Sequence, residues 1–221
     1  MKKSVLLLSA LAGVAAVSAA HAYTISTLGS WDGSQSVSPW GGGGTNTYGE
    51  VFTAPGASLT SFTFEVNDSS PATFVAEVYA WNGSVTGGSN PQGTGGPALY
   101  TSAPMTTAGA GGFTAITINT GGVALTPGQN YVIDFYDNSG DGVATTWGLT
   151  SHGTPFDGGF NFNNGPSSSA VWDDFGDFGS LAYSATFDAG VPEPASWALM
   201  LVGVGAIGGA MRSRKRLAAA V

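Results

Sequence analysis

The chain has 221 residues, enough for one large domain or two small ones, and its 6 Lys and Arg against 14 Asp and Glu give a net charge of -8. All six basic residues lie near the two ends, so the stretch 23–191 contains no Lys or Arg and every acidic residue except Glu193. A body without cations cannot neutralise phosphates, which excludes nucleic acid as a partner. The absence of Cys excludes disulfides, thiolate metal sites and cysteine nucleophiles.

The first 22 residues have the layout of a secretory signal peptide. Lys2 and Lys3 precede an apolar run over 5–17, and Ala20-His21-Ala22 forms an A-x-A cleavage box. We therefore expect signal peptidase to cut after Ala22, so that the mature chain begins at Tyr23 outside the cytoplasm. The alternative is an uncleaved anchor, although the apolar run is short for a membrane-spanning helix.

The residues that follow alternate between apolar and polar types, as β-strands do. Strands are expected over 50–53, 59–66, 72–81, 98–102, 113–119, 130–136, 145–150, 170–173 and 180–188. In the second of these, Phe62 and Phe64 face away from Glu65, and in the third Phe74 faces away from Glu77.

Clusters of Gly, Pro, Asn and Asp separate the predicted strands, and no helical periodicity longer than about two turns precedes Pro194. Without helices to cross between parallel strands, the sheets should be antiparallel. The sequence therefore predicts an all-β fold, an antiparallel two-sheet sandwich of jelly-roll type that forms one extracytoplasmic domain over 23–190.

The predicted sandwich offers few catalytic groups. Once the leader is removed, His152 is its only histidine, and without Cys, Lys or Arg the usual nucleophilic triads and Schiff-base lysines are unavailable. Paired carboxylates are the one catalytic option, because glycoside hydrolysis needs only two, and Glu65 and Glu77 are the candidate pair. The other interpretation is that both are exposed sheet residues, and we expect no enzymatic activity.

Oxygen ligands gather at the end of the predicted strand over 130–136. Asp134, Asp137, Ser139 and Asp141 lie close together in the sequence, among glycines that permit tight turns, and this suits a calcium ion. The downstream bidentate Glu of a calcium loop is missing, so an ordinary Asp/Asn/Gly turn is the other interpretation. Calcium is therefore a candidate cofactor.

Tryptophans are the candidate carbohydrate contacts, because aromatic faces near polar side chains can stack on sugar rings. Trp31 and Trp40 flank a polar, Gly-rich segment and are the expected exposed pair, which makes them the candidate sugar-stacking residues. Burial in the core is the other fate of tryptophan in a small sandwich.

The C-terminal segment 191–216 combines a motif, an apolar stretch and a basic cluster. Pro192 and Pro194 flank Glu193 and keep the backbone extended, as a processing enzyme requires. Residues 195–211 carry no charge and are just long enough for a single transmembrane helix. The basic cluster over 212–216 holds its end in the cytoplasm, and 217–221 form a tail.

This layout resembles the PEP-CTERM sorting signal of Gram-negative bacteria. The residues that carry the resemblance are Pro192, Glu193, Pro194, Trp197, Arg212, Arg214, Lys215 and Arg216. The resemblance implies processing by an exosortase, a membrane cysteine transpeptidase, typically in species that build an exopolysaccharide matrix. Stretches of the body, such as 52–56 and 125–131, are similar to those of PEP-CTERM surface proteins and lectin-like sandwiches.

Together these features predict an exported protein that is held transiently in the inner membrane and then passes to the cell surface or extracellular matrix of a Gram-negative bacterium. Its expected partners are signal peptidase, exosortase and exopolysaccharide, and its expected role is non-catalytic. A carbohydrate-binding matrix module, with or without calcium, is the alternative function, and a glycoside hydrolase is the third.

Overall fold

The computed structural model describes residues 22–41, 45–85, 92–139, 145–150, 159–174, 179–188 and 200–205. The chain divides into a unit over His21–Gly190, called the body below, and a second unit made of Met1–Ala20 and Val191–Val221. The described part of the body consists of strands and loops with a single 3-10 turn, η1 (Leu28–Ser30). In the second unit, residues 200–205 are helical.

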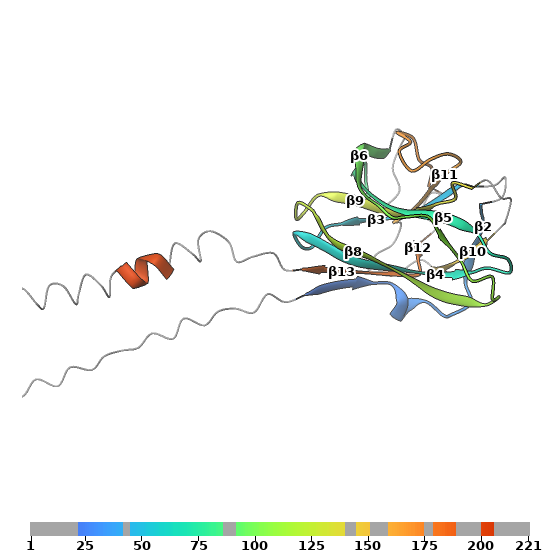
Figure 1. Cartoon of the computed structure of the whole chain (residues 1–221), viewed down its shortest axis with the longest axis horizontal. Helices are drawn as coiled ribbons and strands as arrows, with labels where there is room; N and C mark the ends of the chain where they lie inside the picture. Colours follow the sequence, from blue (N-terminus) through green and yellow to red (C-terminus); the bar gives the residue numbers. More distant parts are fainter. Residues whose placement is uncertain are drawn as a thin grey trace, which may run out of the picture. The chain divides into compact units, whose positions relative to one another are not determined.

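Thirteen strands in the described residues form two sheets (Figure 1). The first sheet contains β1 (Tyr23–Ser26), β2 (Ser36–Trp40), β4 (Ser58–Asn67), β8 (Phe113–Ala124), β10 (Thr145–Thr150), β12 (Ser180–Leu181) and β13 (Tyr183–Asp188). The second sheet contains β3 (Thr47–Thr53), β5 (Thr73–Asn82), β6 (Gly93–Thr101), β7 (Met105–Thr106), β9 (Asn130–Tyr136) and β11 (Phe160–Asn163).

All pairs of these strands are antiparallel. The order is β1-β13-β4-β10-β12 in the first sheet, with β8 also on β4 and β2 on β10, and β11-β3-β9-β5-β6 in the second, with β7 on β5. From β7 to β12 successive strands alternate between the sheets, which is the connectivity of a Greek-key or jelly-roll sandwich and not of a meander. The predicted fold class is confirmed.

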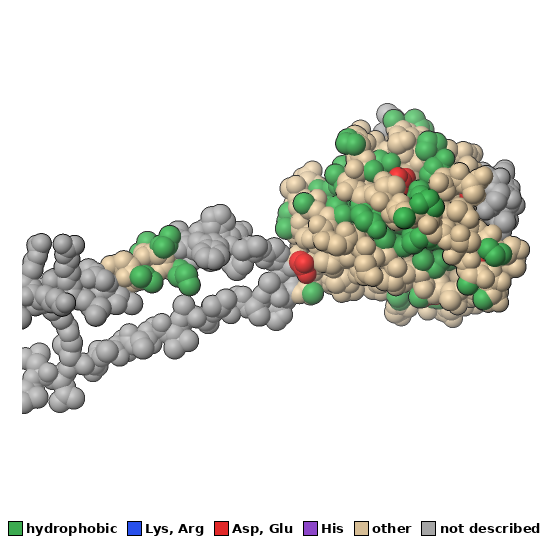
Figure 2. All heavy atoms as spheres, in the orientation of Figure 1, with side chains coloured by type: hydrophobic (Ala, Val, Ile, Leu, Met, Phe, Trp, Pro, Cys, Tyr) green, Lys and Arg blue, Asp and Glu red, His purple; other side chains and the backbone are tan. Residues whose placement is uncertain are grey.

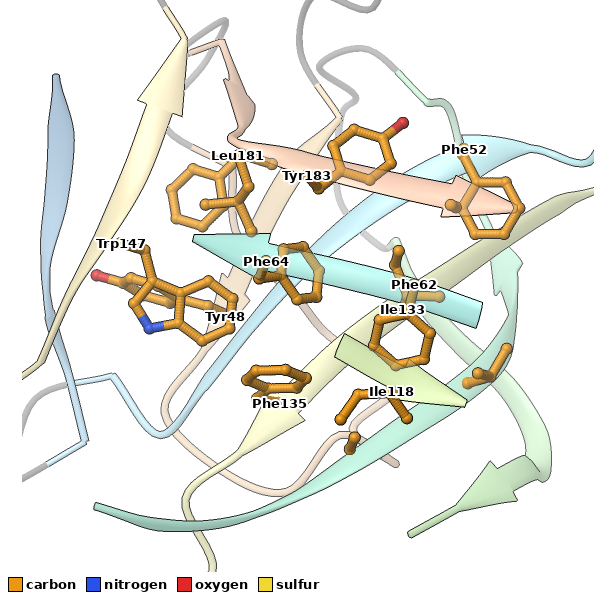
Figure 3. Close-up of a cluster of buried hydrophobic side chains, with 14 of the residues drawn as sticks. Tyr48, Phe52, Phe62, Phe64, Ile118, Ile133, Phe135, Trp147, Leu181 and Tyr183 are labelled. Carbon is orange, nitrogen blue, oxygen red and sulfur yellow. The ribbon is translucent and has the colours of Figure 1, made fainter. Parts of the chain in front are cut away.

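Aromatic side chains fill the space between the sheets (Figure 3). Trp147 of β10 is fully buried, and its ring centroid lies 4.9 Å from that of Phe64, 5.2 Å from that of Phe135 and 5.6 Å from that of Tyr48. Phe64 comes from the first sheet, whereas Tyr48 and Phe135 come from the second. The rings meet edge to face or tilted, the arrangements that aromatic quadrupoles favour.

The central strands of the second sheet, β3, β5 and β9, are buried on both faces. The inner face of this sheet belongs to the core between the sheets, while Val51, Tyr79, Trp81 and Val132 on its outer face form a second apolar cluster with Trp172. Glu77 does face away from Phe74, as the alternation predicts, but this polar side of the strand is covered by other residues.

The predicted strand boundaries hold best where strands are central. The strands expected over 130–136 and 145–150 coincide with β9 and β10. The strand expected over 170–173 is wrong, because there the chain makes only an isolated bridge between Asp173 and Phe162. β1, β2, β7 and β11 were not predicted, since they are short and most residues of β1 and β2 are exposed or half-buried, which removes the apolar alternation.

One face of the body carries little charge among its described side chains (Figure 2). On the face that Figure 2 shows, described side chains are mostly uncharged, Asp and Glu form small separate patches, and no Lys or Arg is visible. This agrees with the sequence, because all six basic residues lie outside the described ranges.

Candidate functional site

The first and last strands of the body are neighbours in one sheet. β1 pairs with β13, from Tyr23 opposite Phe187 to Ser26 opposite Ser184. Directly after β1, the Thr27 hydroxyl donates a 2.6 Å hydrogen bond to the Leu181 carbonyl and accepts one of 2.9 Å from the Tyr183 amide. The chain therefore enters and leaves the body through paired strands, and β13 ends at Asp188, shortly before the predicted sorting motif in the sequence.

The sorting residues fall outside the described ranges. They are Pro192, Glu193, Pro194, Trp197, Arg212, Arg214, Lys215 and Arg216. Within the predicted transmembrane segment 195–211, only residues 200–205 are described, and these are helical and exposed. Among the described residues no helix is long and apolar enough to cross a membrane. The transmembrane helix therefore stays a prediction.

The predicted signal-peptide boundary coincides with the start of the body. Ala20 lies outside the described residues, whereas Ala22 is exposed and Tyr23 begins β1. A cut after Ala22 would therefore leave β1 whole, although the cleavage itself stays a prediction.

Two carboxylates lie side by side on the outer face of the second sheet. Glu77 of β5 is the direct register partner of Asp134 of β9, and we call these two residues the outer-face carboxylates. Asp134 is fully buried and Glu77 is 8% exposed. Thr101 donates a 3.0 Å hydrogen bond to Glu77 Oε1, and the Tyr79 hydroxyl lies 3.5 Å from the same oxygen.

The segment 164–174, called the cover segment, lies on this outer face. The Ser167 hydroxyl donates a 2.6 Å hydrogen bond to Asp134 Oδ1, and Trp172 packs edge to face on Trp81 with ring centroids 5.6 Å apart. Thr94 of β6 holds the segment further, because its amide and its hydroxyl both donate to the Ser169 carbonyl. The cover segment therefore contacts Asp134 directly and packs on the apolar cluster beside it.

Burial shifts the ionisation of groups around this pair. Removal from water raises the pKa of Asp134 well above its usual range, and the negative charge of Glu77 adds to this effect, whereas the Ser167 hydroxyl opposes it. Burial, and then the charges of Glu77 and Asp134, also raise the pKa of the Tyr79 phenol. The surroundings thus disfavour the charged forms of both the Asp134 carboxyl and the Tyr79 phenol.

A further carboxylate, Glu50 of β3, is buried in the core between the sheets. Its Oε2 accepts a 2.9 Å hydrogen bond from the Leu181 amide, while its Oε1 has no hydrogen-bond partner. Burial raises the pKa of Glu50 well above its usual range, and the Leu181 amide opposes the shift. Gly159 is packed so closely on Glu50 that a Cβ there would collide with Oε1.

The predicted catalytic pair does not form. Glu65 lies on β4 of the first sheet and is half-buried, whereas Glu77 lies on β5 of the second sheet, so the two do not face one another across a strand pair. The reason is that strands adjacent in sequence need not be adjacent in a sandwich, since the chain between β4 and β5 crosses from one sheet to the other.

The four candidate calcium ligands divide among different contacts. Asp134 points its Oδ1 at Ser167 of the cover segment. Asp137 Oδ1 instead accepts hydrogen bonds from the Ser139 amide, at 3.0 Å, and hydroxyl, at 2.7 Å, which is the geometry of an ordinary Asx turn. Asp141 lies outside the described residues. In the described ranges, no three or more His, Cys, Asp or Glu side chains are grouped for metal binding.

The expectation that Trp31 and Trp40 are both exposed is wrong for Trp40. Trp40 is fully buried in the core, where its indole nitrogen donates a 3.1 Å hydrogen bond to the Phe135 carbonyl. Trp31 is half-buried, donates to the Gln35 carbonyl and meets the ring of Phe113 edge to face with centroids 4.8 Å apart. His152 lies outside the described residues.

Sequence reasoning missed Glu50 and the partnership of Glu77 with Asp134. The signal for Glu50 was local, since it shares a strand face with Tyr48 and Phe52 and so faces the core. The pairing of Glu77 with Asp134 left no local signal, because it depends on which distant strand lies beside β5 and in which register.

Comparison with known proteins identifies the C-terminal segment. Residues 190–215 match the PEP-CTERM protein-sorting motif, which includes Pro192, Glu193, Pro194 and Trp197. No curated protein and no solved structure matches the chain. The resemblance seen in the sequence is thus confirmed, and the motif indicates a secreted, membrane-transiting surface protein that is processed by exosortase.

Proposed function

We propose that the body is a non-catalytic component of an exopolysaccharide matrix, delivered to the surface of a Gram-negative bacterium when exosortase processes the chain at Pro192-Glu193-Pro194. The observation that carries this proposal is that the sorting motif follows the last strand of the body in the sequence and does not overlap it. β13 is the last strand of the body and ends at Asp188, before the matched motif begins at residue 190. Processing at the motif would therefore release a sandwich whose strands are all intact.

The way β13 is held supports the same proposal. Phe187, one residue before the end of β13, is fully buried and packs on Phe52 with ring centroids 5.4 Å apart. Tyr23 of the neighbouring strand β1 is the register partner of Phe187. A cut beyond Asp188 would remove none of these contacts, so the released body should keep its stability.

The charge of the body suits a matrix component. Between 23 and 191 there are acidic residues but no Lys or Arg, so the released body would carry net negative charge and would repel anionic surfaces unless divalent cations bridged it. The same charge disfavours binding to nucleic acid, because the body offers no cations to neutralise phosphates.

The sorting step is tested by replacing Pro192, Glu193 and Pro194 with Ala in the producing bacterium. We expect the full-length form to accumulate in the membrane fraction on immunoblots, while the wild-type chain is shortened and released. A matched control replaces three exposed residues of the turn after β8, Thr126, Pro127 and Gln129, with Ala. Normal release of the motif variant, or retention of the control, would contradict the proposed role of the motif.

The non-catalytic part of the proposal is tested by incubating the purified chain with the producer's polysaccharide and measuring reducing ends. We expect none above a heat-treated sample. If the wild-type chain releases reducing sugar and Glu77→Gln does not, the protein is a glycoside hydrolase. Asp134 would then be the second carboxylate, because Asp134, unlike Glu65, is the register partner of Glu77.

Carbohydrate binding is the second candidate function, and one observation favours it. Trp31 and Phe113 are both half-buried and in contact, so they offer adjoining aromatic surfaces at the start of β8. If they bind sugar, Trp31→Ala should reduce pull-down on the producer's polysaccharide, whereas Leu99→Ala, which removes an exposed apolar side chain from β6, should not. Equal pull-down of the two variants would remove this candidate.

A further inference from the structure

Among the described residues, no cationic side chain balances the outer-face carboxylates. Asp134 is fully buried and Glu77 nearly so, and they stand directly opposite one another on adjacent antiparallel strands. Like charges in that position destabilise a sheet. In other proteins a Lys, Arg or His side chain would neutralise such a pair, but the described part of this chain contains none of these residues.

Asp134 also carries an oxygen that no described group satisfies. Its Oδ1 accepts a short hydrogen bond of 2.6 Å from the Ser167 hydroxyl. Its Oδ2 is buried and has no hydrogen-bond partner. A buried carboxylate oxygen without a donor is costly unless a ligand binds it.

Several oxygens of the kind that hard cations prefer lie around the pair, beside the apolar cluster of the same sheet face. Besides the two carboxylates, the hydroxyls of Thr101, Tyr79 and Ser167 lie within hydrogen-bond reach of one or the other. The chain has no Cys, so no thiolate competes with these oxygens for a metal ion.

We propose that Glu77 and Asp134 bind a calcium ion between β5 and β9, beneath the cover segment. Asp134 Oδ2 and the Glu77 carboxylate supply the charged ligands, and hydroxyl oxygens and water complete the shell. The ion neutralises both carboxylates and, through Asp134 and Ser167, fastens the cover segment to the sheet. This site differs from the turn at Asp137, whose carboxylate is engaged with Ser139.

The test uses the full-length chain in detergent, freed of metal with a chelator, at constant pH 7.5. Thermal unfolding is followed by tryptophan fluorescence during titration with calcium, with magnesium and with sodium at matched ionic strength. We expect Tm to rise with calcium and to saturate, with half-saturation at about 0.1–1 mM, the range of extracellular calcium modules. Magnesium should act more weakly, because it demands a near-ideal octahedral shell.

Substitutions locate the ion. Asp134→Asn keeps the shape of the side chain and should weaken calcium binding by at least about tenfold, and Glu77→Gln should do the same. Glu77 reaches the surface, so Glu77→Gln keeps the test informative if Asp134→Asn does not fold. Glu65→Gln is the matched control, since it removes one half-buried carboxylate from the first sheet and should leave the calcium response unchanged.

Terbium provides a direct probe, because it replaces calcium and its emission is sensitised by nearby aromatic rings. Tyr79 and Trp81 lie on the same strand face as Glu77, so the wild-type chain and Glu65→Gln should give sensitised emission that calcium displaces, and Asp134→Asn should not. The proposal is overturned by any of three results: no saturable rise in Tm with calcium, an equal rise with sodium, or a wild-type response in both Asp134→Asn and Glu77→Gln.

Discussion

The buried Glu50 carboxylate should make the stability of the body fall as pH rises. Burial raises the pKa of Glu50 in the folded chain, so below the pKa of an unfolded Glu the side chain is protonated in both states and has no effect on stability. Above that pH the unfolded chain releases the proton while the folded chain keeps it. Glu50→Gln, which has the same shape and no proton to exchange, should therefore remove this loss of stability.

The size of the effect follows from one proton taken up on folding. Such uptake lowers the free energy of unfolding by about 1.4 kcal/mol for each pH unit between the unfolded and folded pKa values. From pH 5.5 to pH 7.0 the stability of Glu50→Gln relative to wild type should therefore rise, and one proton sets an upper limit of about 2 kcal/mol on this rise. Asp134 contributes equally to both chains, so its effect cancels in the difference.

The assay is denaturant unfolding of the full-length chain in detergent, with chelator present, followed by tryptophan fluorescence at the two pH values. Asp32→Asn is the control, because backbone amides of Gln35 and Ser34 lower the pKa of that exposed carboxyl. Asp32 is ionised above pH 5.5 in both the folded and the unfolded chain. The stability of Asp32→Asn relative to wild type should therefore be the same at the two pH values. A difference between Glu50→Gln and wild type that is the same at both pH values would refute the proton uptake.

Three further substitutions test the packing of the body. Trp147→Ala removes a fully buried ring from the core and should lower the free energy of unfolding by about 3–5 kcal/mol in denaturant titrations. Gly159→Ala should lower Tm, because the new Cβ would lie 2.7 Å from the Val51 carbonyl oxygen as well as against a buried carboxylate. Thr27→Val removes the hydroxyl that donates to the Leu181 carbonyl and accepts from the Tyr183 amide. In the same titration it should lower the free energy of unfolding by about 1–3 kcal/mol.

Matched exposed sites provide the controls for Trp147→Ala and Thr27→Val. Leu99→Ala removes an exposed apolar side chain from β6, and Thr24→Val makes the same chemical change as Thr27→Val on the exposed part of β1. Both should stay within about 0.5 kcal/mol of wild type. Losses as large as those of the buried variants would mean that the effects arise from substitution itself and not from the contacts described.

Local pattern was sufficient for the fold class and for the strands at the centre of the sheets. β4 was predicted with its faces assigned correctly, because Phe62 and Phe64 must share a side of any extended chain. β2 and β11 were missed, since short strands that rely on their neighbours for pairing carry too few residues to show a period.

The candidate sites likewise differ in whether neighbouring residues or tertiary packing define them. The sorting segment could be read from the sequence, because a processing enzyme recognises adjacent residues in an extended chain and Pro192-Glu193-Pro194 are adjacent. The sites within the body could not, because Trp40 and Trp31 have similar sequence surroundings and only the packing of the second sheet buries the former.

The sequence by itself determined how the chain is divided: basic residues only in the terminal segments, a sorting motif near the C-terminus, and an acidic all-β body between them. The tertiary structure alone decided that Glu77 stands beside Asp134 and not beside Glu65, and that the cover segment bonds to Asp134. The physical reason is that composition and alternation are properties of neighbouring residues, whereas the register of β5 on β9 is set by contacts between strands far apart in the chain.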